Sequence, residues 1–84
     1  MKLTKERETQ LVGVLKELML ESSDYYGYTL YEACLEEQNC DAIFMDIFNN
    51  TFNDFEDNYN LSSYERIKIT DKVVKSVLDG GQDA

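Results

Sequence analysis

Residues 41–59 read DAIFMDIFNNTFNDFEDNY, and this stretch holds the most regular pattern in the chain. Large apolar side chains recur every three or four positions, which is the spacing of one face of an α-helix. The stripe consists of Phe44, Phe48, Phe52, Phe55 and Tyr59, with Ile47 and Thr51 beside it. Asp41 is a good N-cap, so we expect the helix to begin close to it. The pattern predicts that this helix buries its phenylalanine side chains in a core.

Helical signals also mark the segments on either side. Leu11, Leu15 and Leu18 predict an amphipathic helix over about residues 4–21, followed by a loop over residues 22–28. Two capping boxes, in which a Thr or Ser stands three positions before a Glu, predict the starts of two more helices. They are Thr29-Leu30-Tyr31-Glu32, before a helix over about residues 30–38, and Ser62-Ser63-Tyr64-Glu65, before a last helix that Gly80-Gly81 ends.

The last helix has a less regular apolar pattern. We expect its inward side chains to be Ile67, Val74, Val77 and Leu78, with Ile69 and Val73 near the edge of the core. Residues 25–31 and 67–69 could be extended instead, and we retain the helical interpretation for both. Together the patterns predict an all-α fold, a compact bundle of three to four short helices forming a single acidic domain over residues 1–84.

Composition excludes several classes of function. The chain has no histidine, no glycine-rich phosphate loop and no Gly-x-Ser-x-Gly motif, so we expect neither an enzyme nor a metal or other cofactor. Cys34 and Cys40 are spaced six apart, which is neither a redox nor a zinc pattern. The N-terminus is charged from its second residue and no apolar run could span a bilayer, so we expect a cytoplasmic protein with no membrane partner.

The distribution of charge is the most informative feature for function. The net charge is −9, yet residues 1–20 hold four basic and three acidic side chains, and residues 61–84 hold four of each. Residues 21–60 hold ten acidic side chains and no Lys or Arg. A purely solubilising surface would mix the two signs. The middle of the chain is therefore expected to present a strongly negative surface.

Two groups of residues are candidates for binding a partner. The first is polar and acidic: Asp46, Asn50, Asn53, Asp54 and Asp57 lie opposite the phenylalanine stripe, and Glu32 and Glu36 are neighbours on the preceding helix. The second is aromatic, because Tyr25, Tyr26, Tyr28 and Tyr31 crowd around Gly27 and tyrosine is enriched at protein interfaces. We take Tyr25 and Tyr26 as candidate anchors and expect two of the four tyrosines to cover the edge of the core.

A surface of carboxylates spaced at about 5–6 Å along a helix suits basic side chains that normally hold phosphates. We therefore expect an inhibitor that mimics nucleic acid and binds a basic protein, such as a nucleic-acid-binding enzyme or nuclease, without binding nucleic acid itself. In composition the chain resembles the small acidic inhibitors that viruses and mobile elements use against CRISPR effectors and restriction enzymes; a viral protein of this kind would act in the host cytoplasm. The alternative is a small regulatory adaptor that binds a different protein through its tyrosines or an apolar groove. The sequence leaves the oligomeric state open.

Overall fold

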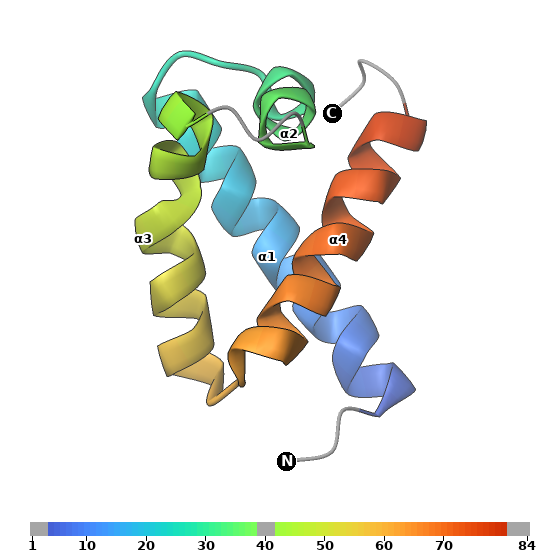
Figure 1. The fold of residues 1–84 in the computed structure, drawn as a ribbon. Helices are drawn as coiled ribbons and strands as arrows, with labels where there is room; N and C mark the ends of the chain where they lie inside the picture. The colour runs from blue at the N-terminus through green and yellow to red at the C-terminus, as the bar shows by residue number, and fades with distance from the viewer. Residues whose placement is uncertain (1–3, 39–41, 81–84) are drawn as a thin grey trace.

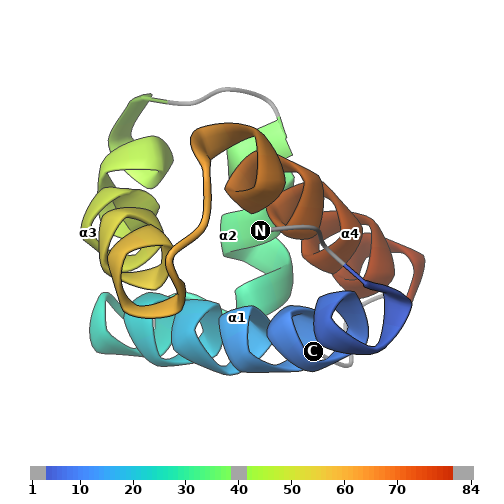
Figure 2. The same cartoon turned by 90° about the horizontal axis from the view of Figure 1, so that it is seen from below.

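The computed structural model describes the backbone of residues 4–38 and 42–80 and the side chains of residues 4–36 and 48–80. This part of the chain forms four α-helices and no strand: α1 (Lys5–Tyr25), α2 (Leu30–Gln38), α3 (Ala42–Tyr59) and α4 (Ser63–Asp79). Each helix contacts the other three. Figures 1 and 2 show α1 lying across one side of the bundle, with α2 between α3 and α4. The predicted all-α bundle is confirmed.

Local capping interactions fix where the helices start. The Thr29 hydroxyl accepts from the Glu32 N–H at 3.1 Å, and the Glu32 carboxylate accepts from the Thr29 N–H at 3.1 Å. Ser62 and Glu65 form the same reciprocal pair at 3.2 and 3.0 Å. Both predicted capping boxes are therefore confirmed. The proposed cap of α3, Asp41, lies outside the described residues.

One residue with a left-handed backbone conformation follows α1, and another follows α3. Gly27 has φ +82°, and its N–H donates to the Asp24 carbonyl at 3.0 Å, while the Tyr28 N–H donates to the Ser23 carbonyl at 2.9 Å. Asn60 has φ +54° and occupies the equivalent place after α3. Both ends are Schellman motifs, which satisfy carbonyl groups that a helix terminus leaves unpaired. They reverse the chain tightly and set the packing of α2 and α4.

The core lies where the four helices meet. Its largest fully buried side chains come from α1, α2, α3 and α4: Leu15, Met19, Leu30, Cys34, Phe48, Phe55, Ile69 and Val73. Phe52 is also buried and Tyr59 packs against the cluster, which confirms the phenylalanine stripe as far as its side chains are described. Phe44 and Ile47 lie in α3, but their side chains are outside the described set.

Two sequence expectations about packing are wrong. Val74 and Val77 are buried as expected, but Ile67 is 55% exposed, and Ile69 and Val73, expected at the edge of the core, are fully buried. Ile69, Val73 and Val77 follow one another at steps of four and form a single stripe. Ile67 lies almost opposite Ile69, because residues two positions apart in an α-helix are rotated by about 200° around the helix axis. A glycine inside α1 could have marked a close helix contact, but Gly13 is exposed and a β-carbon added there would meet nothing within 4 Å, so it marks none.

Helix α1 runs four residues past its expected end at residue 21. Ser23 lies in this extension and is fully buried, and its hydroxyl donates to the Met19 carbonyl at 2.9 Å. The polar residues near the end of α1 are typical of a loop. The helix nevertheless continues, because the buried Ser23 hydroxyl forms its hydrogen bond within the helix, and the helix ends just before Gly27. The extension carries Tyr25 alongside α3.

Replacing Gly13 and Gly27 by alanine should change stability in opposite directions. Gly13 lies on the exposed side of α1, and a β-carbon added there would meet nothing within 4 Å, so Gly13→Ala should add about 1 kcal/mol to the stability. Gly27→Ala should remove about 1–2 kcal/mol, because the left-handed backbone is unfavourable for a residue with a β-carbon. Thermal melts monitored by circular dichroism provide the measurement. Equal changes in the two variants would contradict the described geometry.

Candidate partner-binding site

The predicted polar surface of α3 is present. Asn50, Asn53, Asp54 and Asp57 are all exposed, on the side of the helix opposite the buried phenylalanines. We call these four residues the α3 polar face. Asp46 belongs to the same helix, but its side chain lies outside the described side chains. The face therefore offers two carboxylates and two amides to a partner without disturbing the core.

A cleft of about 380 Å³ lies between the C-terminal half of α1 and the polar face of α3. It is lined by Leu18, Glu21, Ser22 and Tyr25 of α1, by Tyr26, and by Asn50, Thr51, Asp54 and Asn58 of α3. The structure thus brings Tyr25 and Tyr26, the two candidate anchors, next to Asn50 and Asp54. The sequence patterns named the aromatic and the acidic residues as candidates but did not indicate which of them lie side by side.

The base of the cleft is held by a contact between the two helices. The Ser22 and Thr51 hydroxyl groups share a short hydrogen bond in a partly buried position. Above them, the Tyr25 and Tyr26 rings pack edge to face with their centroids 5.1 Å apart. Tyr25 nevertheless remains 84% exposed. An aromatic pair this accessible leaves much of its apolar area available to a partner.

The other candidate residues lie outside the cleft. Glu36 is half-buried on α2 and does not line it. Glu32 is exposed, but its carboxylate is already used in the cap of α2, where it also accepts from the Thr29 hydroxyl at 3.0 Å. Tyr31 is half-buried against the core, which fits the expectation that part of the aromatic cluster covers the core's edge. Tyr28 is 37% exposed and is not packed against the core cluster, so the expectation of two such tyrosines is met by Tyr31 alone.

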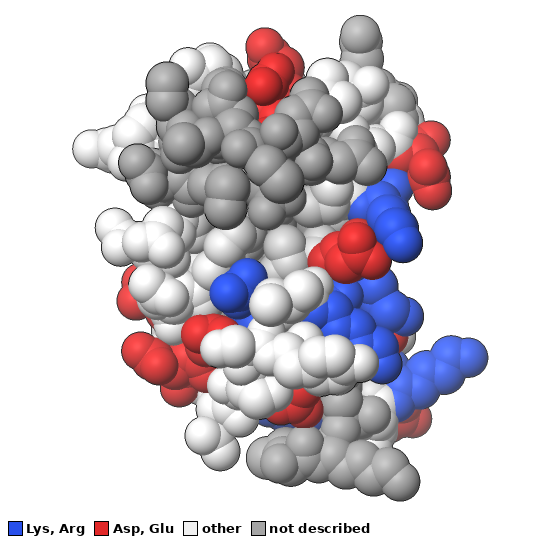
Figure 3. Space-filling view, viewed as in Figure 1, with Lys and Arg blue, Asp and Glu red and all other residues white. Residues whose placement is uncertain are grey.

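Basic side chains gather on a different part of the surface. In the view of Figure 3, acidic side chains lie at the lower left over α3, while Lys and Arg lie mostly over α4 and the start of α1, with further acidic side chains between them and at the top. Several of these bases form ion pairs with acidic side chains of α1 and α4. Lys68 and Lys72 both contact Glu8 of α1, and Lys75 pairs with Asp71 at 3.1 Å. The bases therefore neutralise acids of the two terminal helices more than those of α3.

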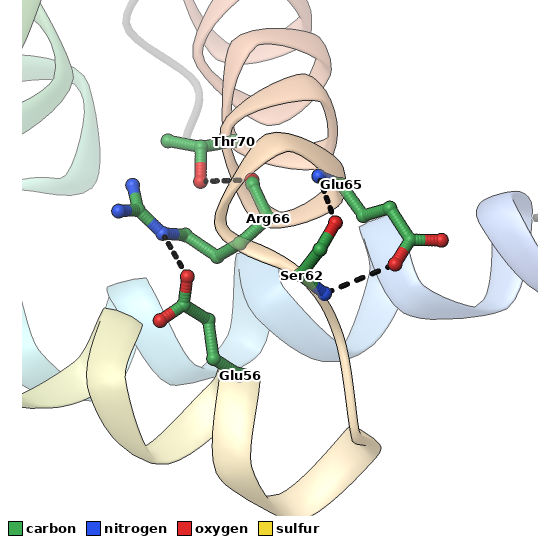
Figure 4. A network of polar contacts seen from close by, with 5 residues as sticks. All are labelled: Glu56, Ser62, Glu65, Arg66 and Thr70. Atoms are coloured by element: carbon green, nitrogen blue, oxygen red, sulfur yellow. Dashed lines mark hydrogen bonds and ion pairs between the residues drawn. The ribbon is translucent and has the colours of Figure 1, made fainter. Parts of the chain in front are cut away.

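One acidic residue of the middle segment does have a basic neighbour. Arg66 of α4 faces Glu56 across the α3–α4 turn, with its Nε atom 3.5 Å from a carboxylate oxygen (Figure 4). Its guanidinium also lies 5.0 Å from the centre of the Phe52 ring. By contrast, no ion pair within the described part of the chain involves Glu21, Asp54 or Asp57. No described Lys or Arg therefore offsets the charge of these three acids by a direct ion pair.

Metal ligands and membrane spans are not found among the described residues. No three His, Cys, Asp or Glu side chains among them are grouped so as to hold a metal ion. No described helix combines the length and apolar character needed to cross a bilayer. Cys34 is buried in the core, and Cys40 lies outside the described residues.

The Glu8 contacts predict a specific pH dependence. A hydrogen bond from Lys72 and the nearby charges lower the pKa of Glu8 below its ordinary value of 4.5. A lowered pKa stabilises the fold above about pH 4.5, and this stabilisation is lost as the pH falls through the lower, folded-state pKa. Glu8→Gln should therefore lower the thermal midpoint at pH 7, and the difference from the parent protein should shrink below pH 4.5.

Asp71→Asn is the matched control for Glu8→Gln. It removes an exposed ion pair within one helix, and such pairs contribute little to stability. Its thermal midpoint should stay close to that of the parent at both pH values. If Glu8→Gln behaves like this control at pH 7, the contact between α1 and α4 does not stabilise the fold.

Comparison with protein-family models, with curated proteins and with solved structures finds no match for this chain.

Proposed function

We propose that this protein is a non-enzymatic inhibitor that binds a basic, nucleic-acid-binding surface of a target protein and thereby keeps nucleic acid away from it. The observation that carries the proposal is the separation of charge on the folded surface. Glu21, Asp54 and Asp57 are exposed and unpaired among the described residues, while the bases of α4 pair with other acids. The target would meet an acidic surface with little competing positive charge.

Elementary electrostatics supports this function. Carboxylates on successive turns of a helix lie about 5–6 Å apart and can be met by Lys and Arg side chains that otherwise contact phosphates. The field of an unbalanced acidic surface also raises the rate at which a basic partner is encountered. The same charge repels DNA and RNA, so the proposed partner is a basic protein and not nucleic acid. A nuclease is a suitable example, and viral anti-CRISPR and anti-restriction proteins are the kind of inhibitor we have in mind.

A second candidate function is favoured by the exposed aromatic side chains. Tyr25 is 84% exposed, and on α4 Tyr64 is 75% exposed beside the accessible Ile67. A regulatory adaptor could use either group to bind a partner that does not recognise nucleic acid. Binding of that kind would depend on apolar contact and would vary little with salt.

Capture from a bacterial lysate distinguishes the two functions. The lysate is first treated with nuclease, so that nucleic acid does not bridge proteins to the immobilised chain. An inhibitor that mimics nucleic acid should capture nucleic-acid-binding proteins at low salt and release them when salt or excess DNA or RNA is added. Partners that resist both treatments and have no nucleic-acid-binding surface would favour the adaptor and overturn the proposal.

A further inference from the structure

The cleft between α1 and α3 combines aromatic rings with carboxylates from opposite sides. Glu21 comes from α1 and Asp54 from α3, and the exposed Tyr25 and Tyr26 rings stand at the end of α1. No Lys or Arg is among the described residues that line it. Its volume of about 380 Å³ lies near the lower end of small-ligand sites, about 300 Å³. This size suits one long side chain.

We propose that the cleft binds an arginine side chain of the partner protein. The inference rests on the proposed function, because it names the anchor by which the basic partner is held. A guanidinium group is planar and weakly hydrated, so it stacks on aromatic rings and donates parallel hydrogen bonds to carboxylates. A lysine ammonium group is compact and strongly hydrated, and it gains less from the same surroundings. The two carboxylates disfavour a phosphate-bearing ligand.

The arginine has to come from another protein. The chain has only two arginines, Arg7 and Arg66. Arg7 donates to the Tyr59 carbonyl at 3.0 Å, and Arg66 lies between Glu56 and the Phe52 ring. Both guanidinium groups are thus engaged within the fold, and a second copy of the chain offers no free arginine to the cleft.

Titration with short peptides tests the site without any target protein. The full chain, labelled with nitrogen-15, is titrated at low salt with acetyl-Gly-Arg-Gly-amide and, separately, with acetyl-Gly-Lys-Gly-amide. The arginine peptide should shift the amide signals of residues 18–26 and 50–58 in a saturable way, with affinity at least about threefold above that of the lysine peptide. Shifts that spread over every acidic segment, or equal affinity for the two peptides, would overturn the inference.

Variants inside and outside the cleft provide matched controls. Asp54→Asn and Tyr26→Ala should each lower the affinity for the arginine peptide by about fivefold. Asp79→Asn, which removes one exposed carboxylate of α4 away from the cleft, and Tyr64→Ala on α4 should bind it like the parent. If Tyr26→Ala does not fold, the comparison of Asp54→Asn with Asp79→Asn decides alone. Equal effects of those two would overturn the site.

The titration also separates this inference from the proposed function. If the arginine peptide does not bind the cleft, the arginine site is refuted. The inhibitor function is then still tested by competition with nucleic acid on the target. Conversely, a saturable arginine site can be measured in the peptide experiment even if the target binds nucleic acid and this protein together.

Discussion

Phe48→Ala should cost about 3–5 kcal/mol of folding free energy, which is the usual range for removing a buried phenylalanine ring. Phe48 is fully buried, and its ring centre lies 5.6 Å from that of Phe52. Small domains are stable by only about 5–15 kcal/mol in total. The variant should therefore be largely unfolded or should melt far below the parent, as measured by far-ultraviolet circular dichroism during urea and thermal unfolding.

Ile67→Ala is the informative control for the core. The structure leaves this residue 55% exposed, so the substitution should change stability by no more than about 0.5 kcal/mol. The sequence pattern alone placed Ile67 toward the core and would predict a much larger loss. A severe effect of Ile67→Ala, or a mild one of Phe48→Ala, would show that the helices pack with different faces inward.

The second large effect concerns binding. Reversing Asp54 and Asp57 to lysine together should leave the fold intact, because both side chains are exposed and form no ion pair among the described residues. Binding to the basic partner should fall by about tenfold or more, mainly through a slower association rate, since the negative field directs the encounter. Surface plasmon resonance at several salt concentrations measures both rate constants.

The double variant Asp71→Lys, Asp79→Lys separates the local surface from the overall charge. Each reversal adds two charges, so both double variants carry a net charge of −5 in place of −9. Asp71 and Asp79 are exposed on α4, away from the cleft. The association rate of this control should fall by a smaller factor than that of the Asp54/Asp57 variant, and its dissociation rate should equal that of the parent. Equal losses in the two variants would mean that net charge alone, and not the α3 polar face, drives binding.

Features that depend on neighbouring residues were predictable from the sequence. The capping boxes at Thr29 and Ser62 involve groups three positions apart, so their signal survives without knowledge of the fold. The phenylalanine stripe of α3 was equally clear, because large rings at regular helical spacing leave only one face that can be buried. The opposite, polar face followed directly from it. These elements account for the successful prediction of an all-α bundle.

Features that depend on packing between helices were not predictable. On α4, Ile67 and Ile69 have the same apolar character, and only the positions of the other three helices decide which is buried. The pairing of Glu8 with Lys68 and Lys72 joins residues far apart in sequence. Long-range contacts of this kind leave no local periodic signal.

The cleft combines features that the sequence could predict with features that depend on how the helices pack. Leu18, Glu21, Ser22 and Tyr25 follow the spacing of one helical face, so the wall on α1 could have been found by extending the helix past residue 21. That wall was missed because Ser22, Ser23 and Asp24 are typical of loops and caps. On the opposing wall, Asn50 and Asp54 were identified, whereas Thr51 was placed beside the phenylalanine stripe and Asn58 was not named. Only the packed structure shows that the two walls face each other.

The most direct test of the inhibitor function is competition on a purified target recovered from the lysate. The affinity of the target for this protein is measured at increasing concentrations of the nucleic acid that the target binds, with ionic strength held constant so that screening does not change. Exclusive binding predicts that the apparent dissociation constant rises in proportion to nucleic acid concentration without reaching a plateau. A dissociation constant that levels off or does not change, with both ligands on the target together, would contradict the proposal that this protein occupies a nucleic-acid-binding surface.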